Sequence, residues 1–407
     1  MKILHTSDWH LGKKLGEFSR HNEQVEVLGE ICNIADYEQV DLVLIAGDIF
    51  DTFNPPVESI ELFYKTIKRL SSKGKRPVIA IAGNHDSPDR MEAPDALALE
   101  DAIILSGNPD TNIRTFKNEN GVEITHASEG FIELKIPAFS YPVRFLINPY
   151  ANAFRLKKFL GTENAEQELR QVLEVKWKEL ANLYLDKNGV NIFCGHFFFM
   201  EENGTAPEEP EDEKPLYIGN AQAIFNTNLP GQVQYAALGH LHRKQVISNF
   251  PCPVVYCGSP LAYSFSESFQ TKYVCIIDLE PGESAVIKDI ALIKGRQLAR
   301  ERFKNMDMAI DWLSQNKEKI VEITLESDEF LSAADRKKLY NAHDFIINII
   351  PDIRNAEKNQ TAGLQIDMSK NIKELFVDYF KSKNQQEPDK ELLKLFNEVL
   401  SQEENMD

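Results

Sequence analysis

Several features that would indicate other classes of protein are scarce in this sequence of 407 residues. The five cysteines form no CxxC pair and lie mostly in apolar runs, which predicts reduced, buried thiols of a cytosolic protein. No apolar stretch approaches the ~18 residues of a membrane-spanning helix. Asp8 and His10 follow Met1 so closely that no room remains for a signal peptide. We therefore expect a cytoplasmic protein with no membrane partner.

Basic charge is also scarce, because 45 Lys and Arg residues stand against 63 Asp and Glu residues and give a formal net charge of -18. Such a surplus of negative charge argues against non-specific binding to a polyanion. Any contact with nucleic acid must therefore be local or mediated by metal. The phosphate-binding pattern GxxxxGK[ST] is absent, although a Lys73-Gly74-Lys75 run occurs. ATP chemistry, if the protein depends on it, would belong to a partner.

The strongest positive signal is an apolar run that ends in Gly47-Asp48. Residues 42–46 predict a strand covered on both faces, as in the parallel part of an α/β sheet. Open α/β sheets place their sites beyond the carboxyl ends of strands, and Asp48 lies at such an end. The glycine before it allows the backbone to approach closely whatever the carboxylate binds.

The same arrangement recurs at further predicted strand ends. Strands are expected at 1–6, 77–82, 190–194 and 235–238, and helices over 20–37, after Pro55, over 90–100 and over 163–185. The polar residues that follow these strands are Asp8 and His10, then Asn84 with His85 and Asp86, then His196, and finally His240 with His242.

Together, these strand ends offer two aspartates, one asparagine and four histidines as metal ligands, which are too many for one ion. Carboxylate, amide and imidazole ligands suit Mn, Fe or Zn better than Ca or Mg, and no thiolate joins them. Two ions about 3.5–4 Å apart can hold a phosphoryl centre, activate water at neutral pH and stabilise the leaving oxygen. The pattern therefore predicts two-metal phosphoryl chemistry.

Four segments, HTSDWHLG, GDIFDT, GNHDSP and GHLH, resemble those of the calcineurin-like metallophosphoesterases, in particular the DNA nucleases that work with an SMC-type ATPase. The resemblance covers essentially the whole chain and implies two divalent ions, with Mn2+ as the expected metal. The implied ligands are Asp8, His10, Asp48 and His242 for one ion and Asp48, Asn84, His196 and His240 for the other, so that Asp48 bridges the two.

The same resemblance assigns catalytic roles and an activity. His85 would support the scissile phosphate and protonate the leaving 3′ oxygen without binding metal, and Asp86 would orient it. The implied activity is 3′ to 5′ digestion of duplex DNA with endonuclease cleavage of single strands and hairpins. No role is predicted for Asp51, where some relatives carry histidine, or for the acidic segment 201–214.

The implied fold is a four-layer α/β/β/α sandwich with a small α+β cap domain and a C-terminal helical hairpin. A chain of this length exceeds a single core of ~250–300 residues, and we place the domains at 1–279, 280–362 and 363–407. Residues 288–304 form the only strongly basic run. DNA contacts are expected from Lys294, Arg296, Arg300 and Arg302.

The tail has an apolar stripe at helical spacing. Its members are Leu375, Phe376, Tyr379, Phe380, Leu392, Phe396, Val399 and Leu400. This stripe predicts either a docking module for a partner or a structural cover for the cap domain, and the sequence leaves both open. The resemblance implies that the partner is the coiled-coil base of the ATPase. The same resemblance implies that the helices after Pro55 and Arg90 form a homodimer, which gives a heterotetramer with the ATPase and a nucleoid-associated complex.

Two other functions remain open at this point. One is a phosphatase or cyclic-nucleotide phosphodiesterase of the same superfamily, which should lack the basic cap and the helical tail. The other is a binding scaffold that kept the fold and lost activity, which degenerate ligands would reveal. Every expected ligand is present in this sequence, so the inactive scaffold is the weaker alternative.

Overall fold

The chain forms two compact units, Met1–Leu325 with Leu331–Pro351, and Glu326–Phe330 with Asp352–Asp407. The structure is a computed structural model. It describes residues 1–152, 154–156, 165–204, 207, 223–327, 331–353, 375–377, 380 and 393. Within these residues, no helix is long and apolar enough to cross a membrane.

A six-stranded sheet carries the first predicted strand ends. Its order is β18 (Val286–Ala291), β17 (Tyr273–Asp278), β1 (Lys2–Thr6), β4 (Leu42–Ala46), β5 (Val78–Ile81) and β6 (Ile103–Ser106). Strands β1, β4, β5 and β6 are parallel, whereas β17 runs antiparallel to β1. The amphipathic helices α1 (His21–Tyr37) and α2 (Val57–Leu70) bury their apolar faces against this sheet, as the sequence predicts.

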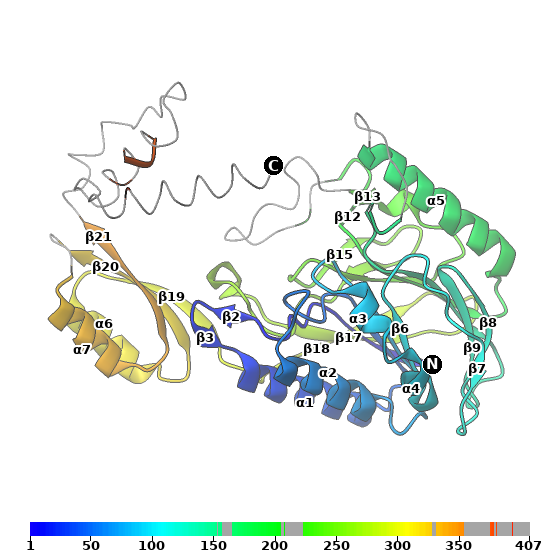
Figure 1. The fold of residues 1–407 in the computed structure, drawn as a ribbon, viewed down its shortest axis with the longest axis horizontal. Coiled ribbons are helices and arrows are strands. Elements are labelled where there is room, and N and C mark those ends of the chain that lie inside the picture. The colour runs from blue at the N-terminus through cyan, green and yellow to red at the C-terminus, as the bar shows by residue number, and fades with distance from the viewer. Residues whose placement is uncertain are drawn as a thin grey trace. The chain divides into compact units, whose positions relative to one another are not determined.

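An eight-stranded sheet carries the other strand ends. Its order is β15 (Gln245–Ser248), β16 (Val254–Tyr256), β14 (Tyr235–Gly239), β11 (Val190–His196), β10 (Val143–Asn148), β9 (Phe131–Lys135), β8 (Glu123–Ser128) and β7 (Phe116–Lys117). Helix α5 (Ala165–Tyr184) covers its outer face through Leu173 and Trp177. The inner faces of the two sheets share a core of aliphatic side chains. The predicted α/β/β/α sandwich is therefore confirmed (Figure 1).

The predicted helix over 90–100 is wrong in detail. The structure has α3 (Pro88–Glu92), α4 (Asp95–Ala98) and the 3-10 turn η1 (Leu99–Asp101) instead of one helix. Pro94 lies between α3 and α4, and proline lacks the N–H that a continuous helix would use. The remaining short elements are β2 (Lys14–Leu15), β3 (Phe18–Ser19), β12 (Phe199–Met200), β13 (Ile224–Phe225), η2 (Asn226–Asn228) and η3 (Phe265–Glu267).

A small group of strands and helices follows the sandwich in the sequence, at the place where the α+β cap is expected. Its strands β19 (Leu298–Phe303), β20 (Ile320–Ser327) and β21 (Ile346–Ile353) form a three-stranded sheet. Helices α6 (Met306–Gln315) and α7 (Ala333–Ala342) cover one face of this sheet (Figure 1). Strand β18 lies in the six-stranded sheet, and the domain limits at 280 and 362 stay predictions.

Most of the predicted tail stripe lies outside the described residues, as does most of the acidic segment 201–214. Of the stripe, the structure describes Leu375, Phe376 and Phe380, whereas Tyr379, Leu392, Phe396, Val399 and Leu400 fall outside it. The rings of Phe376 and Phe380 lie 6.1 Å apart, which fits neighbouring turns of one helix.

Candidate metal centre

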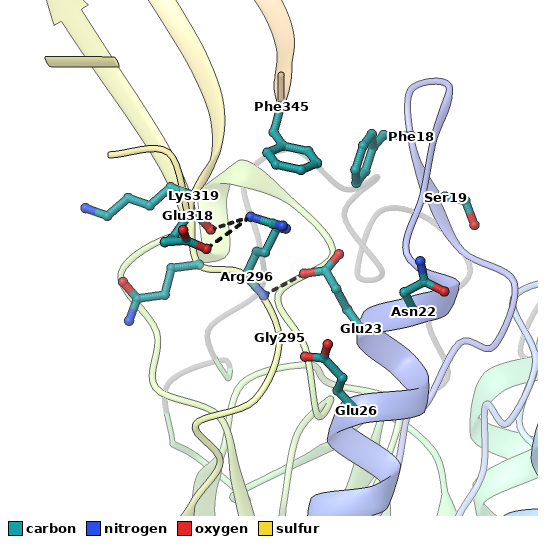
Figure 2. A pocket seen from close by; sticks show the side chains of 11 residues that line it. Phe18, Ser19, Asn22, Glu23, Glu26, Gly295, Arg296, Glu318, Lys319 and Phe345 are labelled. Atoms are coloured by element: carbon teal, nitrogen blue, oxygen red, sulfur yellow. Dashed lines mark hydrogen bonds and ion pairs between the residues drawn. The ribbon is translucent and has the colours of Figure 1, made fainter. Parts of the chain in front are cut away.

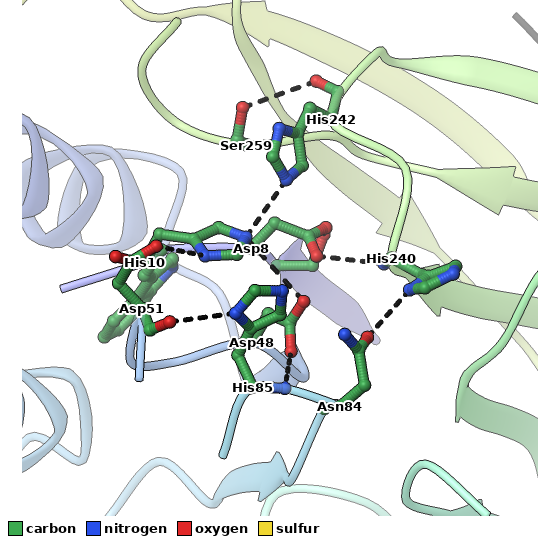
Figure 3. Close-up of polar contacts among 12 residues, drawn as sticks. Asp8, His10, Asp48, Asp51, Asn84, His85, His240, His242 and Ser259 are labelled. Atoms are coloured by element: carbon green, nitrogen blue, oxygen red, sulfur yellow. Dashed lines mark hydrogen bonds and ion pairs between the residues drawn. The ribbon is translucent and has the colours of Figure 1, made fainter. Parts of the chain in front are cut away.

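The carboxyl ends of β1, β4 and β5 in one sheet meet those of β11 and β14 in the other. Two backbone hydrogen bonds hold the first loops together, from the Asp8 amide to the Gly47 carbonyl (2.9 Å) and from the His10 amide to the Asp48 carbonyl (3.0 Å). The seven predicted ligands gather at this edge, and Figure 3 shows six of them with their contacts. Parallel strands explain the convergence, since their carboxyl ends lie at the same edge of a sheet.

The first ligand group consists of Asp8, His10 and His242, whose ligand atoms all lie within 4.8 Å of one another. The Nε2 atoms of the two histidines lie 3.0 Å apart. Oδ2 of Asp48 lies 3.7 Å from Nε2 of His10. Lone-pair atoms directed at one point in this way fit a divalent cation that takes nitrogen and oxygen ligands.

The second group consists of Asp48, His196 and His240, with Asn84 between the two histidines. Oδ1 of Asn84 lies 3.0 Å from Nε2 of His196 and 2.9 Å from Nδ1 of His240. Oδ2 of Asp48 lies 3.3 Å from Nε2 of His196. Asp48 is therefore within reach of both groups, in the place where a bridging carboxylate would lie.

The backbone is strained at four of these seven residues. The φ angles of Asp8, His10, Asp48 and His240 are 52°, 43°, 48° and 113°, a region that residues with a side chain rarely adopt. Such conformations cost free energy and persist where the surrounding structure enforces them, often at functional sites. The strain therefore marks the same edge that the ligand pattern marks.

Two glycines in the predicted motifs are required by close packing. A Cβ atom at Gly83 would lie 2.0 Å from Oδ1 of Asp48, and one at Gly239 would lie 1.8 Å from the carbonyl oxygen of Ala46. Neither position has room for any side chain. Both glycines therefore allow their strand ends to pack closely against the carboxyl end of β4.

The electrostatics of the cluster favour cations. Burial, reinforced by the charge of Asp48, raises the pKa of Asp8 to about 6. Burial alone would lower the pKa of His196, but Asp48 raises it to about 9. Burial lowers the pKa of His10 to about 4 and that of His240 to about 3, which keeps both imidazoles neutral and able to bind metal. The donor set therefore fits two divalent ions, which would supply the positive charge that the buried carboxylates demand.

His85 lies beside the cluster and outside both ligand groups of the seven. Its ring is 5.0 Å from that of His10, and its amide donates to Oδ1 of Asp48 at 3.0 Å. Its Nδ1 lies 2.8 Å from the carbonyl oxygen of Asp51. Because a carbonyl only accepts, Nδ1 carries the proton and Nε2 is left to face a reacting group. A third possible ligand set, His10 with Asp51 and His85, shares His10 with the first group.

The structure does not place the Asp86 carboxylate against His85. Asp86 is buried and accepts hydrogen bonds from three backbone amides, those of Ile49 (3.0 Å), Phe50 (2.8 Å) and Gly83 (2.8 Å). These bonds tie the loop after β5 to the loop after β4. Burial and the charge of Asp48 nevertheless raise the pKa of Asp86 to about 6. Its observed contacts make it a brace between two ligand loops, and the carbonyl of Asp51 is the group that orients His85.

Two of the four residues predicted to contact DNA already have partners within the protein. Arg296 lines a cavity of about 500 Å³, together with Glu318 and Phe345 (Figure 2). Its guanidinium lies 3.8 Å from the centroid of the Phe345 ring and 3.5 Å from the Glu318 carboxylate. Arg300 pairs with Glu322 at 2.6 Å. Lys294 and Arg302 are exposed. The structure thus gives Arg296 and Arg300 partners within the protein.

Two groups near the cluster were missed by the sequence reasoning. Glu267 in η3 approaches His242, and Arg155 donates to the carbonyls of Gly83 and Asp86, both at 2.9 Å. Neither residue follows a predicted strand, so no signal of the kind used for the ligands could have found them. Burial is their shared property, and it becomes visible only in the fold.

Comparison with known proteins agrees with this geometry. The family model described as "Calcineurin-like phosphoesterase" matches residues 1–243. The chain is 35% identical to SbcD, the D component of the nuclease SbcCD, of Bacillus subtilis over 100% of both chains. Proteins of the same name from Staphylococcus saprophyticus and Escherichia coli are 32% and 29% identical, over 73% and 83% of this chain and 70% and 81% of their own. The chain therefore belongs to the calcineurin-like phosphoesterases and, within them, to the SbcD family of nucleases, which makes it a metal-dependent phosphodiesterase.

Proposed function

We propose that the chain cleaves DNA at the cluster on β1, β4, β5, β11 and β14, with two divalent ions and Mn2+ as the preferred metal. The observation that carries this proposal is the pair of ligand groups that meet at Asp48. Asp8, His10 and His242 would hold one ion, Asn84, His196 and His240 the other, and Asp48 both. When bound, the ions supply Lewis-acid polarisation of the phosphate and activation of water at neutral pH.

The protein's own groups would perform the remaining steps. The Asp51 carbonyl accepts from Nδ1 and fixes the ring of His85, so that the imidazolium form, with a second proton at Nε2, can pass that proton to the leaving 3′ oxygen and return to the neutral ring. Asp86 and Arg155 keep the loop that carries Asn84 and His85 in place through their hydrogen bonds to its backbone. Fixed loops limit the reorganisation that the transition state would otherwise require.

The substrates and polarity would be those of the resembled nucleases: 3′ to 5′ digestion of duplex DNA and endonuclease cleavage of single strands and hairpins. Lys294 and Arg302, with Arg296 and Arg300, would contact the DNA backbone. Support for a duplex substrate comes from the cap unit and its basic run, which a phosphatase acting on small molecules would not need.

The experiment that tests this function compares cleavage of duplex, hairpin and single-stranded DNA by the full chain with Mn2+, Mg2+ or chelator. Mn2+-dependent cleavage of all three, with 3′ to 5′ polarity on duplex ends, is expected. Turnover of a cyclic nucleotide or a phosphoprotein, with no cleavage of DNA, would contradict the proposal. Two bound Mn2+ ions without any hydrolysis would instead favour an inactive scaffold.

We further propose that the chain works as a homodimer bound to an SMC-type ATPase, corresponding to SbcC, in a heterotetramer. The relatives are named as components of SbcCD, and the chain lacks a phosphate-binding loop of its own. Deletion after Ala362 should leave Mn2+-dependent endonuclease activity intact and abolish its stimulation by ATP. Co-purification of the truncated chain with the ATPase at unchanged affinity would show that the tail is only a structural cover.

A further inference from the structure

Two histidines of one ligand group have carboxylates behind them. Nδ1 of His242 lies 3.5 Å from Oε1 of Glu267, and Nδ1 of His10 lies 3.4 Å from Oδ1 of Asp51. These are the rear nitrogens of both rings, because the Nε2 atoms face each other at 3.0 Å. Each imidazole that shares a ligand group with Asp8 is therefore backed by an acid.

Each of these carboxylates is held by a lysine. Lys272 forms an ion pair with Glu267, and its Nζ also donates to the His242 carbonyl (3.0 Å) and to Oγ of Ser259 (3.1 Å). Nζ of Lys13 lies 3.0 Å from Oδ1 of Asp51. Glu267 is fully buried and Lys272 is only 9% exposed. Because a buried ion pair often stabilises a fold no better than apolar side chains would, stability alone does not explain it here.

The second ligand group is built differently. The rear nitrogen of His196, Nδ1, donates to the Ala46 carbonyl at 2.9 Å. A neutral carbonyl fixes the ring and its tautomer, whereas a carboxylate also raises the basicity of the imidazole as a metal ligand. The rear nitrogen of His196 therefore faces a neutral carbonyl, whereas those of His10 and His242 face carboxylates.

We propose that Glu267 and Asp51 are positioning residues that orient His242 and His10 and make the ion held by these histidines the more tightly bound of the two. This inference rests on the proposed two-ion function. The loss of such an outer partner typically costs 10–100-fold in metal affinity. Lys272 and Lys13 take part by fixing the carboxylates, and Lys272 also by fixing the backbone at His242.

The test is a Mn2+ titration of the metal-free full chain, with free Mn2+ measured by electron paramagnetic resonance. The native chain should bind two ions with different affinities. Glu267→Gln and Asp51→Asn should each weaken the tighter ion by about 10–100-fold and leave the weaker one unchanged. Asp186→Asn is the matched control, because Asp186 pairs with Arg144 at 2.7 Å and belongs to neither ligand group.

Glu267→Gln leaves Lys272 as an uncompensated buried charge, which can unfold the chain by itself. The double variant Glu267→Gln with Lys272→Met removes both charges and keeps similar volumes. Thermal unfolding of the metal-free double variant should recover relative to the single variant, while its Mn2+ affinity should stay low. A merely structural pair predicts that stability and Mn2+ affinity recover together.

Two further backgrounds identify which ion is affected. His196→Ala weakens the second group, and in that background Glu267→Gln should lower the affinity of the remaining tight ion. In the His242→Ala background, the same substitution should have little effect, because the ring that it orients is gone. Equal Mn2+ affinities in the native chain and in every folded Glu267 and Asp51 variant would overturn the inference. A native chain that binds no Mn2+ at all would instead overturn the proposed function.

Discussion

The sandwich edge and the cap sheet present their polar residues in opposite ways. At the edge, Asp8 is 0% exposed and Asp48 is 2% exposed, and both are fixed by backbone hydrogen bonds between loops. On the cap, the basic residues are more exposed, and the side chains of Arg296 and Arg300 pair with Glu318 and Glu322. The edge holds its buried carboxylates in one geometry, whereas two of the positive charges on the cap are already paired with glutamates.

The difference follows from how the two sets of residues are placed. Ligands at the edge follow parallel strands, so sheet geometry alone brings them together. Of the four basic cap residues, Arg300 and Arg302 lie on β19, and the parallel register sets Arg300 opposite Glu322 and Arg302 opposite Thr324 of β20. One positive charge of the basic run is therefore paired with an acid on the neighbouring strand. The strand-end motifs predict which side chains come together, whereas the charged run does not show which of its side chains already have partners within the protein.

The largest effect is expected at the centre of the edge. Asp48→Asn should abolish DNA cleavage and weaken both Mn2+ ions, because one carboxylate serves both ligand groups. Metal analysis and nuclease assays on the same preparation measure this, and thermal unfolding of the metal-free variant controls for folding. A variant that keeps both ions and still cuts DNA would show that Asp48 does not bridge the two ions.

The next effect separates proton transfer from metal binding. His85→Gln should retain two Mn2+ ions and normal DNA affinity while turnover falls by roughly 10²–10⁴, the range for a lost general acid. His126→Gln is the control, because His126 is an exposed histidine on β8 whose ring lies 4.8 Å from that of Tyr184. If Mn2+ occupancy falls in His85→Gln, then His85 is a ligand in the set that it forms with His10 and Asp51.

A smaller effect tests the packing that holds the edge together. Gly83→Ala places a Cβ 2.0 Å from the Asp48 carboxylate, and overpacking of this kind costs about 1–3 kcal/mol of stability. Displacement of the ligand should also weaken Mn2+ binding, on the order of tenfold to a hundredfold. Gly29→Ala is the matched control, since nothing lies within 4 Å of the Cβ it would add in α1. Equal Mn2+ affinity in both variants would show that Mn2+ binding tolerates a displacement of the Asp48 carboxylate.

These variants also mark where sequence reasoning succeeds. The apolar runs and the glycines before Asp48, Asn84 and His240 predicted the strands and the edge at which the structure brings the seven candidate ligands together. The apolar runs were sufficient to predict these positions, because each candidate ligand follows a strand that can be recognised from a few consecutive residues. The break between α3 and α4 was missed because a single proline, Pro94, outweighed an otherwise helical spacing.

The remaining features depend on contacts that are distant in sequence. Glu267 reaches His242 from a 3-10 turn 25 residues further along the chain, and no spacing rule connects the two. Asp86 was expected beside His85, its neighbour in sequence, yet its carboxylate turns to the amides of Ile49 and Phe50. Adjacent residues in a tight loop point in different directions, so adjacency is a weak guide to side-chain partners. Only the fold decides which buried acid serves which histidine.

The smallest effects are expected on the cap, where they sharpen the contrast with the edge. Lys294→Ala should weaken DNA binding a few-fold and reduce the salt dependence by about one counterion, because one phosphate contact is lost. Hydrolysis of bis-nitrophenyl phosphate should be unchanged, since this small substrate needs only the edge. Lys178→Ala, on α5 and paired with Glu174, is the control for the loss of a positive charge.

Arg296→Ala should behave differently from Lys294→Ala. Its guanidinium packs on Phe345 and pairs with Glu318, and its amide donates to Glu23 at 2.6 Å. Removal of the side chain should therefore lower the unfolding temperature as well as the DNA affinity, because packing and charge are lost together. Measurement of both quantities for both variants distinguishes the roles. A normal unfolding temperature with a full loss of one counterion in Arg296→Ala would mean that the arginine leaves Phe345 to bind DNA, and that the cap charges are as available as their sequence suggests.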